Sequence, residues 1–187
     1  MQTPTSARPL TWSRVVMNRA CADLIGALPY TSFDALEISG RHWRDFGFAR
    51  YRQANHPDYD LCAGPLPERF DLVIAEQVFE HLLYPYRAGR HVHAMLRPGG
   101  YFLCSVPFLV KVHDYPYDCT RWTATGLRHF LHECGFPLDG IECGEWGNRA
   151  CVEASFDDWV LYDPARHDLA HEPEFPYHVW ALARRAP

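Results

Sequence analysis

Residues 70–107 read FDLVIAEQVFEHLLYPYRAGRHVHAMLRPGGYFLCSVP, and this stretch decides the fold. Two apolar runs, 70–75 and 101–106, have the length of buried strands, and residues 86–97 between them carry apolar side chains at a helical spacing. The Pro-Gly-Gly sequence at 98–100 is a stop signal between the helix and the second strand. This order predicts a β-α-β unit of a parallel sheet. Because ligands bind beyond the carboxyl ends of such strands, the polar residues that follow the first strand mark the place to look for a site.

The rest of the chain repeats this alternation. Apolar spacing predicts a helix over 15–28 and another that begins after Thr123 and closes at Gly135. The remaining predicted elements are strands over 33–38, 49–54, 141–143 and 177–183, at most a short helix over 43–48, and a helix over 149–159. The chain is therefore expected to be α/β with a mainly parallel sheet, one domain over 1–187, with 1–14 as a loose leader.

The composition narrows the class of protein. Of the 187 residues, 48% are hydrophobic, which is typical of a folded domain with a substantial core. The formal net charge of -5 argues against a large nucleic-acid footprint. No stretch approaches the roughly 18 apolar residues of a membrane span, and the N-terminus lacks the apolar core of a signal peptide. We expect a cytoplasmic protein with neither a nucleic acid nor a membrane as partner.

The cysteines indicate reduced thiols. Their number, seven, is odd, and no C-x-x-C pair occurs, so neither a disulfide framework nor a zinc site is expected. His91 and His93 form an H-x-H pair, but residues two apart on a helix do not share a face. The sequence therefore predicts no metal centre.

Several segments together resemble a known family. They are 35–40 (ALEISG), 70–81 (FDLVIAEQVFEH), 95–100 (MLRPGG), and a tail with Pro107, Phe108, His113, Pro116, Asp118, Arg121, Trp122, Thr123, Gly126, Leu127, Gly135 and Phe136. In this order and spacing they resemble class I S-adenosylmethionine-dependent methyltransferases, in particular the small type 11-like branch. The resemblance implies a Rossmann-like, mostly parallel seven-stranded sheet with helices on both faces and an antiparallel last strand. It also implies S-adenosyl-L-methionine as cofactor.

The resemblance places the amino-acid end of the cofactor at Glu37, Ser39 and Gly40. The family usually has several glycines in this loop, because glycine lets the backbone approach the cofactor closely. Here Gly40 is the only glycine in the immediate turn. Either the cofactor sits against a rearranged loop or the site is degenerate, and we favour the first because the other motifs are intact.

The other cofactor contacts follow from the same resemblance. Asn55 falls near the position of the usual ribose-binding acid, and its carbonyl can accept one hydroxyl. Asp60 and Leu61 resemble the segment that frames adenine. Glu76 and Gln77 end the strand at 70–75, where their backbone can contact the cofactor.

The polar loop over 107–123 is the best candidate for the substrate site. His113 is the natural general base, since its ordinary pKa suits neutral pH. Asp118 can orient that histidine or bind substrate hydroxyls. Arg121 can pair with Asp118 or hold an anionic group, and both can instead form a buried network that ties the loop to the next helix.

Four further residues complete the candidate site. His81 either lines the transfer centre or caps a helix, so we count it with His113 and Asp118 as a catalytic candidate. Its neighbour Glu80 is expected to be a structural hydrogen-bond partner. Tyr115 and Trp146 are predicted to form walls of the substrate pocket.

The leading hypothesis is a methyltransferase that uses S-adenosylmethionine on a small molecule, with a sugar or other metabolite hydroxyl as acceptor and a histidine-assisted in-line transfer. A non-catalytic ligand-binding or partner protein on the same fold is the first alternative. An enzyme that binds the cofactor but catalyses cyclisation or isomerisation is the second. The sequence also allows a homodimer.

Overall fold

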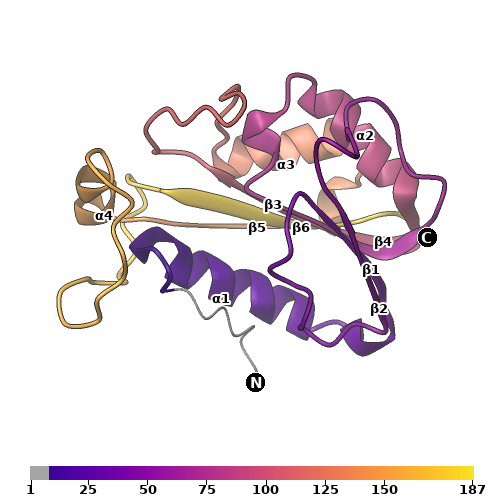
Figure 1. The fold of residues 1–187 in the computed structure, drawn as a ribbon. Coiled ribbons are helices and arrows are strands. Elements are labelled where there is room, and N and C mark those ends of the chain that lie inside the picture. The colour runs from indigo at the N-terminus through magenta and orange to yellow at the C-terminus, as the bar shows by residue number, and fades with distance from the viewer. Residues whose placement is uncertain (1–8) are drawn as a thin grey trace.

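The computed structural model describes residues 9–187, which contain a central six-stranded sheet with helices on both faces (Figure 1). The strands are β1 (Asp34–Ile38), β2 (Arg50–Ala54), β3 (Phe70–Glu76), β4 (Leu96–Pro107), β5 (Ile141–Trp146) and β6 (His178–Arg184). They lie in the order β2-β1-β3-β4-β6-β5. The first four are parallel to one another, whereas β6 runs antiparallel between β4 and β5. The α/β class and the antiparallel last strand are as predicted.

The helices form two layers. Helix α1 (Trp12–Gly26) covers one face of the sheet, and α2 (Pro85–Met95) and α3 (Ala124–Glu133) cover the other (Figure 1). The short α4 (Arg149–Ala154) follows β5. Three single 3-10 turns complete the elements: η1 (Tyr30–Ser32), η2 (Phe79–His81) and η3 (Leu138–Gly140). Among the described residues, we find no helix that combines the length and the apolar character needed to cross a membrane.

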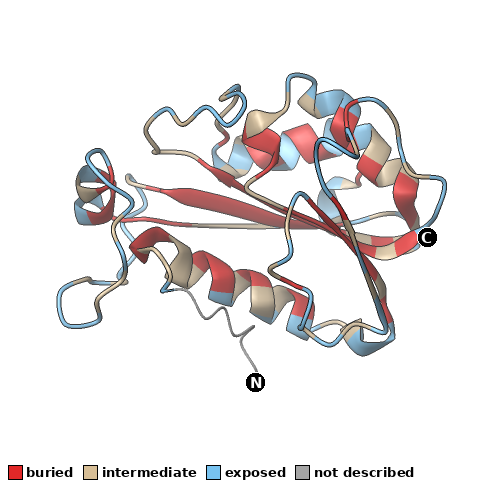
Figure 2. Ribbon diagram, in the orientation of Figure 1, coloured by how far each residue is buried: buried red, intermediate tan, exposed pale blue. Residues whose placement is uncertain are grey.

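The alternating side chains of β3 explain why both faces are covered. Val73 packs in the core beneath α2 and α3, whereas Leu72 and Ile74 pack in the core beneath α1, and all three are fully buried. A strand whose two faces are both apolar must be buried on both sides. The buried residues accordingly run through the middle of the sheet (Figure 2).

Several element bounds differ from those expected from the sequence. Helix α1 begins at Trp12, so residues 12–14 belong to it and not to the predicted leader, of which residues 1–8 lie outside the described part. The indole N–H of Trp12 donates to the carbonyl of Asp168 (2.8 Å), and its backbone N–H donates to that of Val160 (2.8 Å). These partners lie far away in the sequence, so local periodicity could not reveal them. Residues 43–48 form turns and no helix, and α4 ends at Ala154, short of the predicted end at residue 159.

The sheet has six strands within residues 9–187 and not the seven that the family resemblance implied. The apolar runs of the sequence had themselves indicated six. The segment between β2 and β3 forms turns. It contains Pro57, Pro65 and Pro67, and proline cannot donate to a strand ladder.

Candidate cofactor and substrate site

A cavity of about 1000 Å³ opens at the carboxyl ends of β1 and β3. Its walls come from residues 38–41, from the turns after β2, from residues 77–84 and from the tip of the loop at 115–117. Of the predicted site residues, the cavity brings together Ser39, Gly40, Asn55, Asp60, Leu61, Gln77, His81 and Tyr115. Small-molecule sites usually measure about 300–1,000 Å³, so this cavity has room for a nucleoside cofactor and a small acceptor.

Glu37 holds the first loop in place. Its side chain, in a residue only 1% exposed, accepts hydrogen bonds from the backbone N–H of His42 (2.9 Å) and of Trp43 (3.0 Å) and from the hydroxyl of Tyr51 (2.5 Å). Burial raises the pKa of Glu37. Glu37 does not line the cavity, so its carboxylate organises the loop whose backbone does, and a contact with the cofactor stays a prediction.

Gly40 is required by the same carboxylate. A Cβ at this position would stand 2.3 Å from Oε1 of Glu37, a distance at which something must shift. The single glycine of the turn is therefore the one that the buried acid demands. This loop is glycine-poor but tightly bonded, and the expectation that the cofactor sits against it stays a prediction.

Two cavity residues have backbone angles that L-amino acids rarely adopt. Ser39 follows β1 with a φ of 54°, and Gln77 follows β3 with a φ of 56°. The N–H of Gln77 donates to the carbonyl of Ser105 (2.9 Å), which fixes the turn. Such strain gathers at ligand sites, where the surrounding structure enforces it.

Glu76 connects structural elements beside the cavity through its carboxylate. Its carboxylate accepts from the guanidinium of Arg14 (2.5 Å) and from the indole N–H of Trp43 (3.1 Å), and its side chain is not part of the lining. It thereby joins α1, the first loop and the end of β3. Arg14, Trp43 and Tyr51 were missed by sequence reasoning, because no local pattern marks a residue whose partner lies far along the chain.

The residues predicted to bind the ribose and the adenine lie in the turns after β2, on the solvent-exposed side of the cavity. Asn55 and Asp60 are both exposed and line the cavity. Asp60 accepts from the N–H of Cys62 (2.8 Å), which holds the turn, and Leu61 is buried between them. Asp60 and Leu61, the residues predicted for the adenine, therefore place a carboxylate and an apolar side chain side by side on one wall of the cavity.

The loop over 107–123 is held by an ion pair. Arg121 binds both carboxylate oxygens of Asp118, which also accepts from the backbone N–H of His113 (2.8 Å). The hydrogen-bonded guanidinium lowers the pKa of Asp118 to about 2. Neither Asp118 nor Arg121 lines the cavity, and the bonds of the pair join parts of the loop itself, so a role in substrate binding and a tie to the next helix both stay predictions.

His81 and His113 meet beside the cavity, their rings edge to face with 5.1 Å between centroids. His81 lines the cavity, and its Nδ1 lies 2.6 Å from the carbonyl of Tyr117. Burial lowers the pKa of His113. Glu80 lies behind them, and neither of its carboxylate oxygens has a hydrogen-bond partner among the described residues. Glu80 therefore takes part in a hydrogen bond through its backbone carbonyl, which accepts from the N–H of Cys119 (2.7 Å), and not through its carboxylate.

Of the two residues predicted to form walls of the substrate pocket, one lines the cavity and the other does not. Tyr115 is 88% exposed and stands at the cavity. Trp146 is 2% exposed, packs in the core beneath α1 and donates its indole N–H to the carbonyl of Leu169 (2.9 Å). Trp146 lies outside the cavity and does not form the expected second wall. Its large apolar ring is instead buried with the other core residues.

The fold and the cavity together define the class. Parallel strands with an antiparallel β6 before the edge strand, and a cavity at the carboxyl ends of β1 and β3, are the Rossmann-like architecture of class I S-adenosylmethionine-dependent methyltransferases. A family model described as a methyltransferase domain matches residues 15–141, more than half of the chain. The chain therefore belongs to the methyltransferase-domain family, and the cofactor of its class is S-adenosyl-L-methionine.

Individual relatives are distant. The ubiquinone biosynthesis O-methyltransferase of Pseudomonas syringae pv. tomato is 24% identical over 151 residues, which cover 79% of this chain and 64% of the relative, just under two thirds of its length. A solved S-adenosylmethionine-dependent methyltransferase from Mesorhizobium loti has a TM-score of 0.59 at 18% identity, covering 93% of this chain and all (100%) of that one. Phosphoethanolamine N-methyltransferase 2 of Haemonchus contortus, solved with S-adenosyl-L-methionine, has a TM-score of 0.60 at 13% identity, covering 92% of this chain and 53% of that one. At such identities the solved structures support the fold.

Proposed function

We propose that this protein transfers the methyl group of S-adenosylmethionine to a hydroxyl group of a small molecule. The observation that carries the proposal is the cavity, which joins the strained first loop, the turns after β2 and His81 at one edge of the sheet, with His113 packed against His81 outside the lining. The curated relative is an O-methyltransferase, which supports a hydroxyl as the acceptor. A sugar or other metabolite hydroxyl is the specific acceptor that we propose.

The cofactor residues of this proposal all lie on the cavity wall. Ser39 and Gly40 would meet the amino-acid end through their backbone. Asn55 would hold a ribose hydroxyl, and Asp60 and Leu61 would frame the adenine. When bound, the cofactor supplies an activated methyl group, and the protein has to orient the acceptor and exclude water.

The histidine pair would accept the proton of the acceptor hydroxyl. Because a carbonyl can only accept, the contact of His81 Nδ1 with Tyr117 places the proton on that nitrogen and leaves the lone pair on Nε2. His113, whose pKa is lowered by burial, is neutral at pH 7 and stands against the His81 ring. Asp118 and Arg121 would act by holding the loop that presents His113.

The first experiment measures cofactor binding by isothermal titration calorimetry with S-adenosylmethionine and with its demethylated product. We expect saturable binding of both below about 1 mM, which corresponds to about −4 kcal/mol. If neither ligand binds detectably, the proposal that this protein uses S-adenosylmethionine is wrong.

The second experiment follows the methyl group. The protein is incubated with methyl-labelled cofactor and a panel of sugars and phenols, and labelled products are sought by mass spectrometry. Transfer to oxygen is expected. Binding of the cofactor with conversion of an acceptor but without label in the product would favour a cyclase or isomerase, and binding without any conversion would favour a non-catalytic protein.

A further inference from the structure

The carboxylate of Glu80 lies in the interior without a counterpart. The side chain has 0% exposure, and neither oxygen finds a hydrogen-bond donor among residues 9–187. Its backbone is fixed, since the Glu80 carbonyl accepts from the N–H of Cys119 (2.7 Å). Buried polar groups almost always have partners, because an unmade hydrogen bond costs about 1–3 kcal/mol. A carboxylate held in such a place therefore suggests an absent positive partner.

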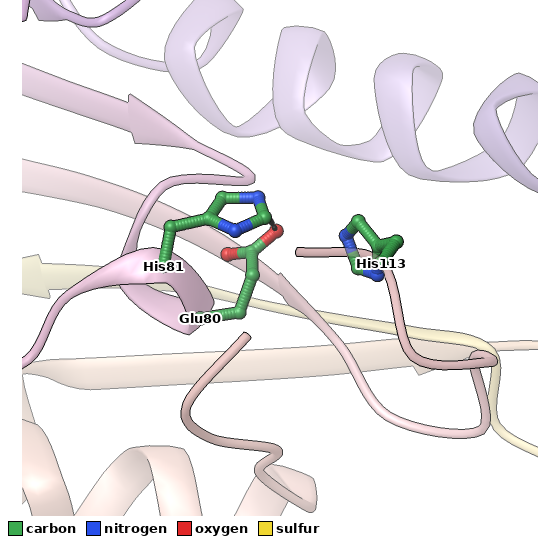
Figure 3. Close-up of side chains that lie close together, drawn as sticks. All are labelled: Glu80, His81 and His113. Carbon is green, nitrogen blue, oxygen red and sulfur yellow. Dashed lines mark ion pairs between the residues drawn. The ribbon is translucent and has the colours of Figure 1, made fainter. Parts of the chain in front are cut away.

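Two imidazole rings flank this carboxylate (Figure 3). His81 Nε2 lies 3.7 Å from Oε1 of Glu80. One ligand atom from each of Glu80, His81 and His113 lies within 4.8 Å of the other two. These three residues come from η2 and from the loop after β4, so the fold brings them together from separate parts of the sequence.

The hydrogen bonds of the two rings prepare them as ligands. His81 Nδ1 faces the carbonyl of Tyr117 at 2.6 Å, and His113 Nδ1 faces that of Lys111 at 3.2 Å. The Nδ1 of His81 therefore carries the proton and its Nε2 keeps the lone pair, and the Lys111 carbonyl favours the same tautomer of His113. A carbonyl that orients the second nitrogen of a histidine in this way is typical of metal ligands. The guanidinium of Arg121 also lies 3.4 Å from His113 Nδ1, but its nearer partner is Asp118 Oδ2 at 2.6 Å.

The neighbouring charges are already matched. Arg121 is paired with Asp118, and Arg14 with Glu76. Burial raises the pKa of Glu80 to about 8, and its ionised form would add one negative charge that no described cation bonds to. A bound cation would satisfy that charge together with the two free imidazole nitrogens.

We propose that Glu80, His81 and His113 bind a divalent transition-metal ion at the edge of the cofactor cavity. Two imidazoles and one carboxylate suit Zn²⁺, Co²⁺ or Mn²⁺, whereas Mg²⁺ and Ca²⁺ prefer ligand sets made of oxygen. Three protein ligands leave positions open, as in catalytic metal sites. The sequence had predicted no metal centre, because its ligands lie apart and follow no zinc-type spacing.

The metal would change how the acceptor hydroxyl is activated. His81 lines the cavity, so an open position beside it can take an oxygen of the acceptor and lower its pKa. The hydroxyl proton would then leave to solvent, and the histidines would serve as ligands and not as bases. This consequence rests on the proposed function, whereas metal binding itself does not.

The test uses the full, untagged chain after dialysis against EDTA. It is titrated with ZnCl₂ in a calorimeter and with CoCl₂ by visible absorption, and MgCl₂ serves as the contrasting ion. We expect one equivalent of Zn²⁺ and of Co²⁺, a visible Co²⁺ spectrum, and much weaker binding of Mg²⁺. Because loss of a partner behind a ligand already weakens metal binding about 10–100-fold, His113→Ala and Glu80→Gln should each weaken Zn²⁺ binding at least that much.

The control is His129→Ala, an exposed histidine on α3, which should bind one equivalent as the unchanged protein does. Circular dichroism checks that each variant is folded, and if Glu80→Gln is not, the loop variant His113→Ala decides. No binding of Zn²⁺ or Co²⁺, or equal binding by His113→Ala, would overturn the proposal. Since these titrations need neither cofactor nor acceptor, they remain decisive if methyl transfer is not observed.

Discussion

Strand β1 carries an acid near each end, and the two acids have opposite surroundings. At its amino end, Asp34 accepts from Arg50 (2.6 Å from Nε to Oδ1) and from Arg97 (2.8 Å), and the Arg50 guanidinium above all lowers the pKa of Asp34 to about 2. At its carboxyl end, Glu37 is buried, has only neutral donors and has a raised pKa. On this strand, the acid at the amino end is neutralised by arginine, whereas the acid at the carboxyl end bonds the neutral donors of the loop beside the cavity.

The largest effect on cofactor affinity is expected at the carboxyl edge from Gly40→Val. The added side chain would collide with the Glu37 carboxylate and displace the loop that lines the cavity. Affinity for S-adenosylmethionine, measured by calorimetry, should fall at least about tenfold, which is about 1.4 kcal/mol. Gly26→Ala is the matched control, because a Cβ there meets nothing within 4 Å, and its affinity should be unchanged. Equal affinities of the two variants for S-adenosylmethionine would show that this loop does not contribute to cofactor binding.

Glu37→Ala should cost about 2–4 kcal/mol of unfolding free energy, measured in urea. The substitution leaves the N–H groups of His42 and Trp43 and the hydroxyl of Tyr51 without their hydrogen-bond acceptor. Tyr51→Phe removes one of these donors and keeps the acid, so its cost should be about 1 kcal/mol. A loss for Glu37→Ala no greater than that of Tyr51→Phe would show that the carboxylate does not organise the loop.

Asp34→Asn should cost about 1 kcal/mol or less, because the ion pairs at the amino edge are partly exposed. Cofactor affinity should not change, since Asp34 lies at the far end of the strand from the cavity. Weaker cofactor binding by Asp34→Asn would contradict the division of the sheet into two edges.

The smallest effects are changes of stability with pH, and they should have opposite signs at the two edges. The folded-state pKa of Asp34 is lowered, so its advantage over Asn is present above about pH 4 and is lost as the pH falls toward about 2. The pKa of Glu37 is raised, so its contribution relative to Gln is complete below about pH 4 and declines as the pH rises through its folded-state value. Urea unfolding of Asp34→Asn and Glu37→Gln beside the unchanged protein at several pH values measures both slopes. Slopes of the same sign would mean that the two acids share one kind of environment.

Local patterns predicted the frame of this molecule well. The β-α-β unit over 70–107 is present as β3, α2 and β4, and Thr123 caps α3 by accepting from the N–H of Gly126 (3.1 Å). Gly135 has the positive φ (111°) expected where that helix closes. These features depend on residues within a few positions of one another, which is why the sequence reveals them.

The site was less predictable because its contacts join distant parts of the chain. The cavity gathers many of the predicted cofactor residues, since the carboxyl ends of parallel strands meet at one edge. Arg14 was assigned to a leader although it binds Glu76, and Trp146 was assigned to a wall although it lies in the core. The unpartnered carboxylate of Glu80 gives no signal in the sequence, because isolation is a property of the surroundings and not of a motif.

The place of β6 in the sheet decides how the gene for this domain can be shortened. A fragment cut to the region that the family model matches, residues 15–141, would lack β6 and nearly all of β5. Strand β4, at present paired with β6 from Tyr101 to Pro107, would become an open edge of buried apolar residues. Exposed edges of that kind template the pairing of strands between molecules. Such a fragment should therefore be recovered as aggregate on expression, and the last ten residues of the chain matter as much to its solubility as any residue around the cavity.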